Sequence, residues 1–105
     1  MMPNTQRGEI AATIDGEQRV LCLTLGALAE LEARLGAGDL VGLGERFASG
    51  RVSARDLTAI LGAGLRGGGN AVTDDDLARM AIEGGLVGAA EIAARLLRAT
   101  FGGEE

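Results

Sequence analysis

Apolar and polar residues alternate in two short segments near the N-terminus, residues 8–14 and 19–24. A period of two is typical of β-strands with one buried face, and the intervening Asp15-Gly16 is a strong signal for a tight turn. The apolar residues are Ile10, Ala12 and Ile14 in the first segment, and Leu21 and Leu23 in the second. They face the same side only if the loop holds an even number of residues, either two or four. We therefore predict a β-hairpin that packs on another element, because an isolated hairpin is marginally stable in water.

In the rest of the chain, apolar residues recur at helical spacing, with a capping residue before every segment except the last and Gly after them. We predict helices from Leu25 to Leu35 after Thr24, in a shorter segment with Leu40, Leu43 and Phe47 after Asp39, in the segments after Ser53 and Thr73, and from Leu86 to Phe101. Ser53 and Asp56 have the spacing of a capping box, and Glu30 and Arg34 form an i, i+4 pair. We expect Gly67-Gly68-Gly69-Asn70 to be a mobile connector and Gly84-Gly85 to separate the last two helices.

One face of each helix is apolar and is expected to point toward the core. The inward residues are predicted to be Leu28, Leu31 and Leu35; Leu57, Ile60, Leu61, Gly64 and Leu65; Leu77, Met80 and Ala81; and Leu86, Ala90, Ala93, Leu97 and Phe101. The predicted fold is α+β and mostly helical, an N-terminal β-hairpin followed by four to five short helices. We expect residues 8–101 to form a single domain, between a disordered segment 1–7 and a frayed tail 102–105.

Composition excludes several kinds of site, since the 105 residues include one Cys, no His and no Lys. Structural zinc clusters need several Cys or His, and catalytic triads and most neutral-pH general bases need His. Cys22 alone forms no intramolecular disulfide, and the Gly-rich stretch 62–70 lacks the Lys of a phosphate-binding loop. Asp74, Asp75 and Asp76 diverge around a helix by about 100° each, which favours charge stabilisation at a helix N-terminus over a metal site. We predict no enzymatic activity, no cofactor and no metal.

The net charge of −5 and the aromatic content of 2% argue against nucleic-acid binding, which uses basic surfaces and, for single strands, aromatic stacking. The chain contains no apolar run long enough to span a membrane, and residues 1–7 lack the apolar core of a signal peptide. We therefore expect a cytoplasmic protein. A small Ala- and Gly-rich core buries little area per residue, which leaves apolar surface for a protein partner.

Segments spread over residues 8–101 carry a resemblance to a known family. They are Gly8-Glu9-Ile10, Ile14-Asp15-Gly16, Leu21–Glu32, Glu45-Arg46-Phe47, Gly50-Arg51, Ser53–Asp56, Gly64–Gly68, Glu83-Gly84-Gly85 and the Ala- and Leu-rich helix ending at Phe101. The most specific part is the strand-to-helix stretch Leu23–Glu32. In these segments the chain resembles the gene transfer agent family of small phage-tail proteins. That family is usually assigned as tail assembly chaperones, and some of its members have been labelled tail tube proteins.

The resemblance implies a non-enzymatic role in building the tail of a gene transfer agent or a prophage. Chaperones of this kind are thought to coat the helical tape-measure protein during tail morphogenesis and to leave as tube subunits polymerise. Tube subunits form stacked rings through extensive β-structure, so the helical prediction favours the chaperone. The first alternative is a tail tube or other virion subunit, which would be virion-associated and contact other tail proteins or copies of itself. The second is a small cytosolic regulator acting through protein contacts.

A chaperone for a long helical protein needs a groove that accepts many similar apolar segments. The predicted last helix is the best candidate to line it, because it is the longest, is rich in Ala and follows Gly84-Gly85. The candidate partner-binding residues are Leu86, Ala89, Ala90, Ala93, Leu97 and Phe101, with Glu32 as a charged contact. The alternative is that the helix residues are ordinary core and that Glu32 is a solvated residue at a helix edge.

Overall fold

The hairpin forms as the alternation predicts. The computed structural model describes residues 8–35, 42 and 51–101. Strands β1 (Glu9–Ile14) and β2 (Glu17–Cys22) pair antiparallel, with Ile14 opposite Glu17. The loop is the two-residue alternative: Asp15 and Gly16 have φ of 57° and 80°, the left-handed conformation at both positions that a type I′ turn requires. The second strand begins and ends two residues earlier than predicted, because pairing continues down to this tight turn.

Three of the four described helices begin directly after a capping residue, and the last begins after Gly84. The four helices are α1 (Leu25–Leu35), α3 (Ala54–Gly67), α4 (Asp74–Ala78) and α5 (Gly85–Phe101). The Thr24 hydroxyl accepts from the Ala27 amide, and Ser53 and Thr73 each form a complete capping box with the Asp three residues later. This order confirms a mostly helical α+β fold with an N-terminal hairpin. Apart from Gly42, the helix predicted after Asp39 lies outside the described residues, as do 1–7 and 102–105.

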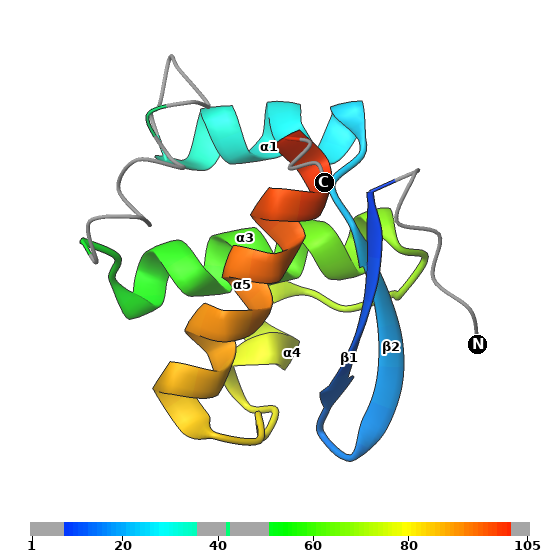
Figure 1. The fold of residues 1–105 in the computed structure, drawn as a ribbon, viewed down its shortest axis with the longest axis vertical. Coiled ribbons are helices and arrows are strands. Elements are labelled where there is room, and N and C mark those ends of the chain that lie inside the picture. The colour runs from blue at the N-terminus through cyan, green and yellow to red at the C-terminus, as the bar shows by residue number, and fades with distance from the viewer. Residues whose placement is uncertain (1–7, 36–41, 43–50, 102–105) are drawn as a thin grey trace.

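The core is centred on α3. Figure 1 shows this helix crossing the middle of the molecule, between α1 and α4, with α5 crossing it and the hairpin at one end. The largest fully buried side chains come from all of these layers except α4: Ile14, Leu21, Leu31, Ile60, Leu61, Leu65 and Leu96. Every residue predicted for the apolar faces of the hairpin and of α3 is buried. The hairpin is therefore stabilised by packing on the helices, as its short length demands.

The Gly-rich end of α3 is packed against β2 and is not the mobile connector that its composition predicts. A Cβ on Gly67 would collide with the carbonyl oxygen of Cys22, and one on Gly68 with that of Val20. The Asn70 amide nitrogen donates to the backbone carbonyls of Val20 at 2.8 Å and Leu65 at 3.0 Å. These glycines therefore serve close backbone approach, a use that local sequence does not distinguish from flexibility.

Helix α4 is shorter than predicted, because the hairpin turn draws the following residues out of the helix. The Asp15 amide donates to the carbonyl of Ala81 at 2.6 Å, the Asp15 carboxylate accepts from the Ala81 amide at 3.3 Å, and Ile14 forms a bridge with Ile82. Ala81 is consequently exposed and not inward as predicted, and Met80 is half-buried. Leu77 is the one residue of the predicted face that is fully in the core.

Candidate functional site

Helix α5 is rotated relative to the face predicted for it. Its buried residues are Gly88, Ala89, Ile92, Ala93, Leu96 and Leu97. The larger side chains of Ile92 and Leu96 take the core positions, and Leu96 lies directly over Gly64 of α3. The prediction that Leu86 and Phe101 point inward is wrong: they are 64% and 45% exposed, and Val87 beside them is 68% exposed. Ala90 is half-buried.

The candidate partner-binding residues consequently do not share one accessible surface. Ala89, Ala93 and Leu97 lie inside the core, while Leu86 and Phe101 are exposed at opposite ends of α5. Glu32 is exposed on α1, as expected for a solvated edge residue. Val87, which the sequence analysis did not select, is the most exposed apolar residue of α5. A helical wheel would have shown Val87 on the outer side only once Ile92 and Leu96 were known to face inward.

An open apolar hollow of about 270 Å³ lies where α3, α4 and the start of α5 meet. Its walls include Leu57, Leu61, Leu77, Met80 and Leu86. The exposed side chain of Leu86 thus forms part of its rim, next to Val87. A concave apolar site with exposed large side chains at its edge is typical of a surface that takes a side chain from another protein.

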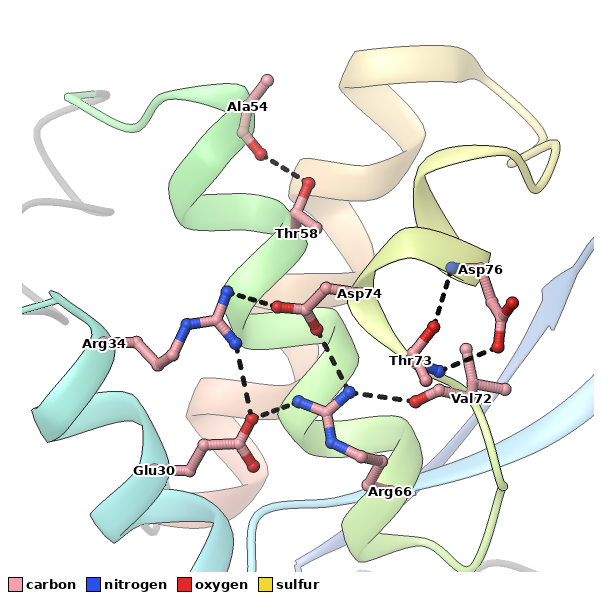
Figure 2. A network of polar contacts seen from close by, with 9 residues as sticks. All are labelled: Glu30, Arg34, Ala54, Thr58, Arg66, Val72, Thr73, Asp74 and Asp76. Carbon is pink, nitrogen blue, oxygen red and sulfur yellow. Dashed lines mark hydrogen bonds and ion pairs between the residues drawn. The ribbon is translucent and has the colours of Figure 1, made fainter.

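Four alternating charges join three helices on another part of the surface (Figure 2). Glu30 and Arg34 of α1 form the predicted i, i+4 pair, at 3.7 Å. Arg66 of α3 contacts Glu30 and also Asp74 at the start of α4, and Arg34 closes the ring by contacting Asp74. The Arg66 guanidinium also donates to the carbonyl oxygen of Val72 at 2.9 Å. This charged ring ties α1 and α4 to α3.

The ring raises the pKa of Arg66. Partial burial by itself lowers the pKa of Arg66, but the hydrogen bonds and charges of Glu30 and Asp74 outweigh it and raise the pKa above its ordinary value. Both carboxylates are occupied by Arg side chains, so the ring offers neither a poised proton donor nor an unpaired base. Its geometry is that of a structural clasp.

Two of the three aspartates of α4, Asp74 and Asp76, also have structural partners. Asp74 belongs to the charged ring, and Asp76 caps its own helix by accepting from the Thr73 amide at 3.1 Å. That capping bond holds the pKa of Asp76 below its ordinary value. Within residues 8–35, 42 and 51–101, no three His, Cys, Asp or Glu side chains are grouped so as to hold a metal ion.

The family model described as phage tail tube protein, GTA-gp10, matches residues 7–103. The chain belongs to this family. The resemblance to gene transfer agent tail proteins is thereby confirmed at the level of the family, whose description says tail tube and not chaperone. Searches of curated proteins and of solved structures found no significant match.

In this GTA-gp10 family member, the large exposed apolar side chains of the described residues lie on two helices. They are at the two ends of α5 and at the start of α1, where Leu25 is 86% exposed. None of the helices in the described part of the chain is long and apolar enough to cross a membrane.

Proposed function

We propose that this chain is a non-enzymatic structural protein of the tail of a gene transfer agent or a related prophage-derived particle. The observation that carries the proposal is the family match over residues 7–103, which spans the hairpin and every described helix. The structure supports it with exposed apolar side chains and an apolar hollow, features suited to contacts with other tail proteins or with further copies of the chain.

A tail assembly chaperone that binds the tape-measure protein in the cytoplasm of the producing cell is the second candidate. It is favoured by the small amount of β-structure: the two described strands have six residues each, whereas tube subunits polymerise through extensive sheets. In that case the outward members of the predicted set, Leu86 and Phe101, would meet apolar segments of the tape measure, with Glu32 available to a basic one. Ala89, Ala93 and Leu97 would serve the core.

Deletion of the gene in a producing strain tests the shared part of both candidates. We expect particles without normal tails in electron micrographs, and restoration by the wild-type gene supplied in trans. A strain that makes normal tails without the protein would refute both candidates and leave the small cytosolic regulator. A paired variant, Leu86→Glu with Val87→Glu, should fail to restore tails although both positions are exposed. The control Glu32→Gln should restore them if Glu32 is only solvated.

A further inference from the structure

The outer flank of α5 is apolar, open and without a cover among the described elements. It consists of Leu86, Val87, Ala90, Ala94 and Phe101, which fall within a ~100° arc of the helix. Leu86, Val87 and Phe101 are exposed, and the two alanines between them are half-buried. In Figure 1, α5 lies across α3 on the outside of the molecule. Large side chains thus stand at both ends of the flank and small ones at its middle.

Two charged residues border this flank on the same side of the helix. Glu91 and Arg98 are seven residues, or about two turns, apart, and both are exposed. Neither forms an ion pair with another residue of the described part of the chain. An acidic side chain three residues before Ala94 and a basic one four residues after it therefore remain available.

We propose that two copies of this chain associate through antiparallel packing of their α5 flanks. A two-fold axis near Ala94 brings Glu91 of each copy opposite Arg98 of the other, so the ion pair forms twice. A parallel arrangement would instead place Glu91 beside Glu91 and Arg98 beside Arg98. The charges thus select both the second copy as the occupant and its direction.

The apolar residues fit the same arrangement. With the axis near Ala94, Phe101 of one copy lies over Val87 and Leu86 of the other, beside the apolar hollow whose rim includes Leu86. The small side chains of Ala90 and Ala94 at the middle allow the two helices to approach closely. The contact covers the exposed apolar side chains at both ends of α5 in each copy.

Analytical ultracentrifugation of the purified chain over a wide range of concentration tests this proposal. We expect a monomer–dimer equilibrium. Glu91→Arg and Arg98→Glu should each raise its Kd by about tenfold, because each reversal replaces two attractive contacts by two repulsive ones. Glu32→Arg, a reversal on α1, should leave the Kd unchanged. Ala94→Glu should prevent association while leaving the far-UV circular dichroism spectrum intact.

Mixing the two single variants gives the most specific result. Glu91→Arg supplies two basic positions and Arg98→Glu two acidic ones, so an equal mixture should form heterodimers with about wild-type affinity. The double variant should also recover. A wild type that is monomeric at its highest soluble concentration, single reversals without effect, or a mixture that stays monomeric would each overturn the proposal. The result concerns the free chain, so it is independent of whether the protein is found in particles.

Discussion

The contact between the end of α3 and β2 predicts a large effect of a single methyl group. Gly68 has φ −85° and ψ 3°, a conformation that Ala adopts without strain, so Gly68→Ala tests space alone. The added Cβ would lie 2.7 Å from the carbonyl carbon of Val20 and 3.1 Å from the Cα of Leu21, besides overlapping the Val20 oxygen. All are backbone atoms of a paired strand, so none can rotate away. Overpacking of this kind costs about 1–3 kcal/mol, equivalent to a Tm lower by roughly 5–20 °C for a chain of this length.

The assay is urea and thermal unfolding followed by far-UV circular dichroism, since the chain lacks Trp and Tyr. Gly26→Ala is the matched control: it lies in α1, where the nearest atom to the new Cβ is the Thr24 hydroxyl at 3.8 Å. There Ala should stabilise the protein by up to about 1 kcal/mol through helix propensity. The reasoning would be refuted if Gly68→Ala were as stable as the wild type, or if both variants shifted stability in the same direction.

Three other changes probe the core, the charged ring and a cap. Leu23→Asp should lower the free energy of unfolding by about 3 kcal/mol or more, because it buries an unpaired charge; unchanged thermal stability would contradict the packing of the hairpin. Arg66→Met should lower the free energy of unfolding by about 1–3 kcal/mol, and by less at high salt, because Glu30 and Asp74 lose this donor. Equal losses at low and high salt would argue against an electrostatic clasp. Because the pKa of Asp76 is lowered, its ionised carboxylate stabilises the folded protein above pH 3.8, and this stabilisation is lost as the pH falls below that value. Asp76→Asn should therefore reduce the loss of stability in an acid titration. An unchanged acid profile would contradict this.

The parts of the fold that depend on neighbouring residues could be predicted from the sequence. The Asp15-Gly16 turn, the caps at Thr24, Ser53 and Thr73, and the bounds of α1 all follow from contacts within a few residues. The i, i+4 pair of Glu30 and Arg34 is local in the same sense. Its extension through Arg66 to Asp74 was not predictable, because it requires three helices to be placed relative to one another.

The residues exposed at the candidate site also depend on how the helices are placed relative to one another. The helical spacing of apolar residues on α5 allows two neighbouring faces to be the buried one. One contains Leu86 and Phe101, and the other contains Ile92 and Leu96. Only packing of Leu96 over Gly64 decides between them. The same applies to Ala81, whose burial on a continued helix was prevented by its bonds to the hairpin turn. Replacing Ala89 and Ala93, which were predicted to line a groove, by Glu would therefore disrupt the core and would not test partner binding.

Quantitative mass spectrometry of purified particles tests the proposed role most directly. The amount of this protein is to be measured relative to the tape-measure protein in tailed particles freed of soluble material. A structural tail protein should be present at several copies per tape measure, and the ratio should stay constant through further purification. Absence of the protein from particles that have complete tails would contradict the structural role, and its recovery instead with soluble tape-measure protein would establish the chaperone.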